Sequence, residues 1–222
     1  CSCTNETIEQ LPMLKRIVEV SEDGSSTNTT INYNGNKIVS IDKADSFLEF
    51  YYTGDLITKT VEIKKSNSYK NTFEYTYLDD KLTKITSSEN YTINYIHNSD
   101  GTISYEKLLK NANNLEIKIY HGILYFHNGN LIKDEQILDN TGNDILSKRE
   151  ISLQYDTKNN PLNNILGLGK LLNYQQLISL NNATVYVEST SVKRINDDQI
   201  ISSIKRIDIQ YQYNSNGYPS EI

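Results

Sequence analysis

The feature that most constrains this chain is a short recurring phrase: an aromatic residue, a polar turn, and an aliphatic residue that starts the next segment. The clearest copies are Tyr33–Ile38, Tyr52–Ile57, Tyr77–Leu82 and Phe126–Ile132. Weaker copies occupy Tyr95–Ile103, Tyr155–Leu162 and Tyr213–Ser220. The Asn, Asp and Gly residues in the turns accept the positive φ that tight hairpins require. Each copy therefore predicts a β-hairpin.

Between the turns, apolar and polar residues alternate, which is typical of strands with one buried and one wet face. In Thr72–Tyr77 the three aromatic rings share one face, and Arg149–Tyr155 repeats the alternation. Hairpins that follow one another in sequence pair with their neighbours in space. The sequence therefore predicts an all-β fold, an antiparallel meander forming a curved sheet or a partly closed barrel.

One segment, near residues 161–182, interrupts this pattern. Its apolar residues have helical spacing and Pro161 stands in the first turn, but Gly167 and Gly169 weaken a helix. We expect one or two short helical turns and then a loop reaching about Asn182. Its Leu and Ile side chains either plug the open end or concave face of the sheet, or form the wall of a ligand pocket. The candidate ligand-binding residues are Tyr155, Leu162, Leu166 and Tyr174.

Composition narrows the possible partners. The chain has 17 Tyr against 4 Phe and no Trp. Tyr suits a half-buried sheet face, so strand packing explains the excess; a Tyr-lined groove for a sugar or peptide is the alternative. A net charge of −6 without a basic stripe predicts that nucleic acid is not a partner. No apolar run reaches the roughly 18–20 residues of a membrane-spanning helix.

Both cysteines of the sequence, Cys1 and Cys3, stand at its beginning, so no disulfide framework can form in the rest. A leading cysteine and a polar stretch up to Pro12 look like a bacterial lipoprotein that carries its lipid on Cys1. The alternative is a fragment cut at this residue. We expect residues 1–13 to be a lipidated tether that holds the protein on the membrane, and 14–222 to be a single β-meander domain.

These turn phrases, the segment Tyr155–Leu162 and the leading cysteine carry a resemblance. The chain resembles Bacteroidetes lipoproteins with a DUF4595 domain, which is described as porin-like and has no known function. The phrases are also similar to the YD repeats of Rhs-type surface proteins, although the strict Tyr-Asp pair occurs only at Tyr155-Asp156. The resemblance spans about residues 14–222. It implies a curved meander that closes partly into a barrel, and no catalytic residues.

No catalytic signature stands out from the sequence. The three histidines, His97, His121 and His127, lack metal-ligand spacing and are best explained as exposed turn residues. Neighbouring carboxylates also lie in expected turns. Nucleophile elbows, phosphate-cradling loops and dinucleotide fingerprints are missing from the sequence. We therefore expect no enzymatic activity, no metal and no cofactor.

Three classes of function follow from these features. The first is a non-enzymatic protein, lipid-anchored in the bacterial outer membrane and facing the periplasm or the surface, that binds a glycan or a peptide. The second is an assembly protein that pairs with another envelope protein through exposed strand edges. The third, a hydrolase, has no supporting motif. A binder would show tyrosines converging in a pocket, near residues 161–182, without being needed for packing, whereas an assembly protein would show a long unprotected edge strand.

Overall fold

The computed structural model describes residues 11–139, 145–194 and 199–221. They form a sheet whose strands are β1 (Arg16–Val20), β2 (Ser26–Asn34), β3 (Lys37–Asp42), β4 (Ser46–Thr53), β5 (Leu56–Lys64), β6 (Lys70–Leu78), β7 (Lys81–Ser87), β8 (Tyr91–His97), β9 (Ile103–Lys110), β10 (Glu116–His127), β11 (Asn130–Leu138), β12 (Ile145–Asn159), β13 (Asn181–Arg194) and β14 (Ile200–Asp208). A separate hairpin follows, made of β15 (Gln212–Tyr213) and β16 (Pro219–Glu221).

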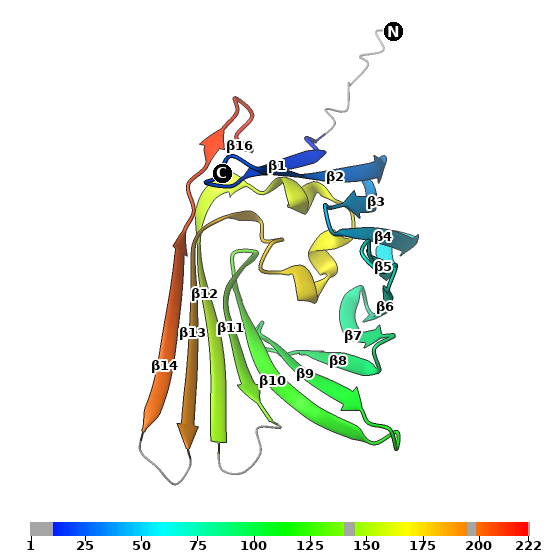
Figure 1. Ribbon diagram of the computed structural model, residues 1–222, viewed down its shortest axis with the longest axis vertical. Helices are drawn as coiled ribbons and strands as arrows, with labels where there is room; N and C mark the ends of the chain where they lie inside the picture. The colour runs from blue at the N-terminus through cyan, green and yellow to red at the C-terminus, as the bar shows by residue number, and fades with distance from the viewer. Residues whose placement is uncertain (1–10, 140–144, 195–198, 222) are drawn as a thin grey trace.

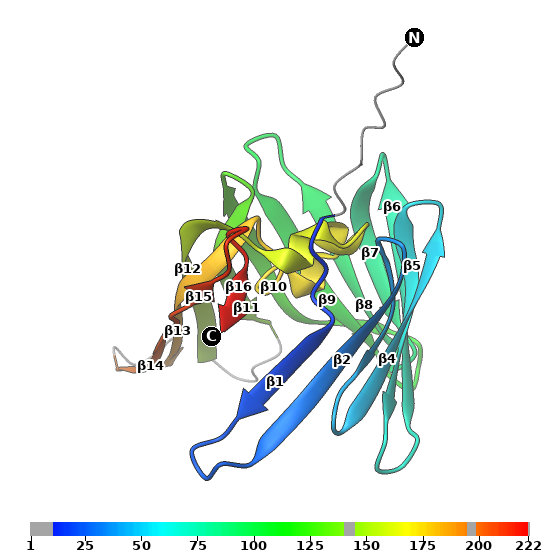
Figure 2. The same cartoon turned by 90° about the horizontal axis from the view of Figure 1, so that it is seen from above.

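The fourteen strands of the large sheet run in sequence order, and each pairs antiparallel with the next (Figure 1). The predicted all-β meander is confirmed. Of the two predicted forms, the structure has the curved sheet and not a closed one. Among the described residues, β1 pairs with β2 alone and β14 with β13 alone, which leaves the two edges apart (Figure 2).

Of the weaker copies of the phrase, Tyr95–Ile103 forms a hairpin without a register shift, and Tyr155–Leu162 leads into the interruption, so the hairpin predicted there is wrong. In its four clearest copies the recurring phrase encodes one local geometry. Its aromatic residue pairs across the hairpin with its own aliphatic residue, as Tyr33 does with Ile38 and Tyr77 with Leu82. A register shift follows at once, because the strand after the turn carries one extra residue. Such a bulge bends the strand and increases its twist. The repeated bulges thus help to curve the sheet.

The aromatic side chain of the phrase also reaches the segment that precedes its own strand in the sequence. There its polar atom forms a hydrogen bond with the main chain, one residue away from the position directly opposite. The contacts are Tyr33 Oη to Leu14 O (2.6 Å), Ile38 N–H to Tyr52 Oη (3.1 Å), Tyr77 Oη to Ile57 O (2.7 Å), His97 Nε2 with Leu82 O (2.9 Å), and Tyr155 Oη to Leu131 O (2.5 Å). His97, expected in a turn, thus lies in β8 and takes the place of a tyrosine. Five strands are thus each tied to the segment before them, whereas Phe126 has no hydroxyl and cannot make this bond.

The interruption after β12 consists of three short 3-10 turns and no α-helix. They are η1 (Pro161–Asn164), η2 (Leu168–Lys170) and η3 (Leu172–Tyr174). Gly167, with a φ of 75°, separates the first two, and a Cβ there would lie 2.7 Å from the carbonyl oxygen of Asp55. A side chain at this position would therefore push the insertion away from the sheet.

The insertion plugs the concave face of the sheet, which is the first of the two predicted roles (Figures 1 and 2). Its apolar residues join one buried cluster with inward side chains of the strands; the four that it contributes are Ile165, Leu168, Leu171 and Ile178. Main-chain bonds fix its position, because Leu166 N–H donates to Asn36 O at 2.9 Å and Tyr52 Oη donates to Leu166 O at 2.9 Å.

The first described residues already belong to the packed body. Met13 and Leu14 lie against the core, and Asn164 Nδ2 donates to the carbonyl of Pro12 at 2.8 Å. Cys1, the predicted lipid site, lies outside the described residues, and the boundary at residue 13 stays a prediction. In the part of the chain that the structure describes, no helix is long and apolar enough to cross a membrane.

Candidate functional site: a tyrosine-lined hollow

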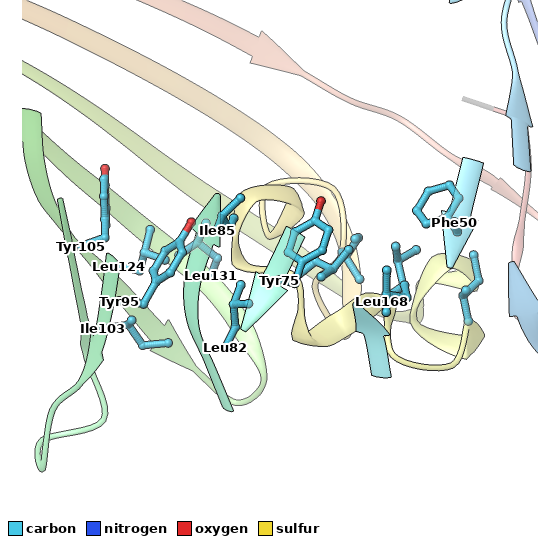
Figure 3. Close-up of a cluster of buried hydrophobic side chains, with 14 of the residues drawn as sticks. Phe50, Tyr75, Leu82, Ile85, Tyr95, Ile103, Tyr105, Leu124, Leu131 and Leu168 are labelled. Atoms are coloured by element: carbon cyan, nitrogen blue, oxygen red, sulfur yellow. The ribbon is translucent and has the colours of Figure 1, made fainter. Parts of the chain in front are cut away.

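A hollow of about 190 Å³ lies between the end of the insertion and the concave face of β8 to β12. We call it the tyrosine hollow. From the sheet it is lined by Tyr95, Tyr105, Tyr120, Asp134, Gln136 and Arg149, and from the insertion by Leu172, Asn173 and Gln176, with apolar residues at its base. Figure 3 shows Tyr95 and Tyr105 at one end of the buried cluster, beside Leu124 and Leu131.

The position of Tyr105 depends on a glycine in the next strand. Tyr105 of β9 pairs with Gly122 of β10, and a Cβ on Gly122 would lie 2.5 Å from Cζ and Oη of the tyrosine. The bare glycine lets the ring lie flat across β10. Its hydroxyl then donates to Oδ1 of Asp134, on β11, at 2.6 Å. Three adjacent strands thus build one polar contact in the lining of the hollow.

Asp134 is a carboxyl group in an unusual place, on the core side of the sheet and only 8% exposed. Burial raises its pKa, while the Tyr105 hydrogen bond, the charge of Arg149 and a hydrogen bond from Gln176 oppose that rise. Burying a carboxylate is costly even when it is hydrogen-bonded. A residue placed at such a cost is a candidate for function.

Arg149 provides the positive charge of the hollow. It stands opposite Gln136 in the β11–β12 register, and its Nε donates to Oε1 of Glu188 on β13 at 2.5 Å. This contact lowers the pKa of Glu188. Arg149 therefore has an acidic partner on one side and faces the buried carboxyl of Asp134 on the other.

The tyrosine rings are packed against one another and stay neutral. Tyr105 lies 6.2 Å from Tyr95 and 6.1 Å from Tyr120 between ring centroids, the second pair being edge-on. Burial raises the pKa of Tyr120 to about 12 and raises the pKa of Tyr95 and Tyr105 as well. At physiological pH all three hydroxyls keep their protons and can donate hydrogen bonds.

The sequence-based candidates lie elsewhere. Tyr155 lines a more open hollow of about 490 Å³ with Asp156 and His127, and its hydroxyl also accepts from Ser179 at 2.9 Å. Leu162 and Tyr174 pack against the core, and Leu166 is held by its main-chain bonds. The structure therefore does not gather these four residues around one cavity.

Asp134 was missed because a bulge changes which side chains of β11 face inward. Continuing the alternation from buried Leu131 directly would place Asp134 on the outer face. The extra residue in β11, Ile132, reverses this parity and turns Asp134 inward. The bulge that recurs with the four clearest phrases was the available signal.

The chemistry of the hollow is that of recognition. Apolar ring surface stands next to groups that donate and accept hydrogen bonds: hydroxyls, three amides, a carboxyl and a guanidinium. Among the described residues, no group of three or more His, Cys, Asp or Glu side chains could hold a metal ion.

Comparisons with known proteins add a description of one structural neighbour. No protein-family model and no curated protein sequence matches the chain. Among the solved structures that match is the crystal structure of a porin-like protein from Bacteroides uniformis, with a TM-score of 0.47 and 12% identity, over 83% of this chain and 78% of that one. We infer neither the fold nor the function of this chain from that likeness. The resemblance to DUF4595 lipoproteins stays a prediction.

Proposed function

We propose that the protein is a non-enzymatic binding protein of the bacterial cell envelope that takes one sugar ring of a glycan in the tyrosine hollow. A single observation carries this proposal: three neutral tyrosines converge on a half-enclosed space whose other walls are Asp134, Gln136 and Arg149. A sugar ring has apolar C–H faces and hydroxyls that both donate and accept. Aromatic rings suit the first, and carboxyl, amide and guanidinium groups suit the second.

The size of the hollow supports a small ligand. Pockets for drug-sized molecules measure roughly 300–1,000 Å³, and the tyrosine hollow measures about 190 Å³. It has room for one ring or for the end of a longer chain. A peptide, the other ligand class considered from the sequence, would need pockets for successive side chains along an extended groove.

An envelope location and a lipid on Cys1 belong to the same proposal. They rest on the sequence of residues 1–12, with the leading cysteine and the polar stretch after it. Mass spectrometry of the native membrane fraction tests this part separately. A Cys1 peptide carrying acyl chains would support the anchor, and an unmodified Cys1 would contradict it.

A glycan array followed by calorimetric titration of the hits tests the binding role. Tyr120→Ala and Arg149→Gln should each weaken glycan binding at least tenfold, because each removes one wall of the hollow. Tyr51→Ala is the matched control, since Tyr51 is exposed on the convex face and should leave binding unchanged. The proposal fails if no glycan binds, if a peptide binds instead, or if the two hollow variants bind as well as the parent.

A second candidate function, assembly, is favoured by a different observation. β14 has nine residues, every one of them exposed, and it pairs on one side only. That is the long unprotected edge expected of an assembly protein.

A further inference from the structure

The two edges of the sheet differ in how they are protected. β1 has five residues, and both Arg16 and Glu19 on it are charged. Short, charged edge strands resist pairing with other chains. β14 is nine residues long and contains four exposed isoleucines, Ile200, Ile201, Ile204 and Ile207. In Figure 1 it forms the outer margin of the sheet, with no described strand beyond it.

We propose that β14 pairs antiparallel with β14 of a second copy of this chain, across a two-fold axis at Ile204. This gives the assembly candidate a specific partner and does not depend on the tyrosine hollow. A two-fold interface requires a surface that is complementary to itself, and the sequence of β14 meets this requirement in the register centred on Ile204.

The main-chain groups at the edge are available in the required pattern. Ile209 N–H donates to Thr184 O at 2.8 Å, in continuation of the β13–β14 register. Hydrogen bonding alternates along an antiparallel ladder. The odd-numbered residues of β14 therefore direct their main-chain groups to β13, and the even-numbered residues direct theirs to the free edge. Pairing centred on Ile204 joins even residues with even residues and allows about ten hydrogen bonds.

The side chains select this register. With Ile204 opposite itself, Ile201 faces Ile207 of the second copy, and Lys205 faces Ser203. A shift of one pairing step in one direction puts Lys205 opposite Lys205, and like charges in that position repel. The shift in the other direction puts Lys205 opposite Ile201. Of these three registers, only the one centred on Ile204 pairs isoleucines and keeps like charges apart.

The oligomeric state of the full chain is the first test. Sedimentation velocity under reducing conditions over a range of concentrations should show a monomer–dimer equilibrium. Ile204→Lys places two charges on the two-fold axis and should raise the dimer dissociation constant at least tenfold. Ile96→Lys is the control, because Ile96 is equally solvent-accessible (65% exposed, against 71% for Ile204) but lies on an interior strand. A monomer at every concentration would overturn the proposal.

A disulfide test locates the axis. In a chain carrying Cys1→Ser and Cys3→Ser, Ile204→Cys should form a covalent dimer on mild oxidation, because the two residues 204 face each other. Ile200→Cys is the matched control on the same strand, 62% exposed. Its symmetry mate would lie about 27 Å away, eight residues along a strand. Equal cross-linking of the two variants would refute the register.

Discussion

The two halves of the sheet share one topology but differ in strand length. From β2 to β8 the strands have six to nine residues, and the insertion seals their concave side with Leu and Ile. In the second half β10, β12 and β13 have twelve, fifteen and fourteen residues, and their inward faces also carry Asp134, Arg149 and Glu188. The buried polar side chains of the first half are all uncharged; they are Ser40, Thr60, Asn71, Ser87 and Thr92. The second half differs in its inward charged side chains and in the hollow between them and the insertion.

The largest expected change in the free energy of unfolding tests how the insertion covers the concave side of β2 to β8. Leu171 of the insertion is 0% exposed, and Leu171→Ala should lower the free energy of unfolding by about 2–5 kcal/mol, because it leaves a cavity. Leu177→Ala, at a site 65% exposed, should change it by less than about 0.5 kcal/mol. Urea unfolding measures both. Equal midpoints for the two variants would mean that the insertion does not hold the concave face.

The next largest change in stability is expected in the half of the sheet that contains the tyrosine hollow. Gly122→Ala should cost about 1–3 kcal/mol, because its Cβ would lie 2.3 Å from Glu135 O and 2.5 Å from the Tyr105 ring. Gly169→Ala is the control, since the nearest atom to its Cβ, Asn163 Oδ1, is 3.6 Å away. Thermal unfolding compares them. If Gly122→Ala were as stable as Gly169→Ala, the glycine would not position Tyr105.

A smaller effect probes the ties between hairpins. Tyr77→Phe removes the hydroxyl that donates to Ile57 O and should lower the free energy of unfolding by about 1 kcal/mol. Tyr51→Phe removes a hydroxyl bonded to Glu49 at the surface and should have almost no effect. Urea unfolding of the pair decides whether the repeated hydroxyl stabilises the fold. The tie would be dispensable if the two variants unfolded alike.

The last variant should be more stable than the parent at pH 7, whereas the preceding variants should be less stable. The pKa of Asp134 is raised in the folded protein, so the folded state holds this proton more tightly than the unfolded state, and stability falls as pH rises above 3.8, the ordinary value for Asp. Asp134→Asn, which cannot ionise, should therefore be more stable than the parent at pH 7 and lose this advantage below pH 3.8. Thermal unfolding at several pH values measures it. A parent that is the more stable protein at pH 7 would show that Asp134 is kept for stability and not for a ligand.

Much of the fold could be predicted because the signals are local. Alternation and turn residues indicate hairpins, and adjacent hairpins pair, so phrases such as Tyr77–Leu82 were sufficient to predict the meander. Whether the sheet closes depends on the sum of many small twists and bends, which no single phrase contains. Where the insertion docks depends on its close approach to the turn at Asp55, a contact distant in sequence.

The site could not be predicted in the same way. Tyr155, Leu162, Leu166 and Tyr174 were selected because they lie in or near the insertion, yet most of them serve packing or main-chain contacts. The residues of the hollow become neighbours only through the register of five strands and the bulge at Ile132. Sequence reasoning therefore lacked the information on which side chains of a strand face inward after a bulge.

The ties from one hairpin to the next have a consequence for how the chain folds. Each joins residues about 15–25 positions apart, so hairpins can add one after another with little loss of loop entropy. The insertion is different, because Tyr52 meets Leu166 across 114 positions. We expect a growing, half-covered sheet to form early, and docking of the insertion to be the slow step that completes it.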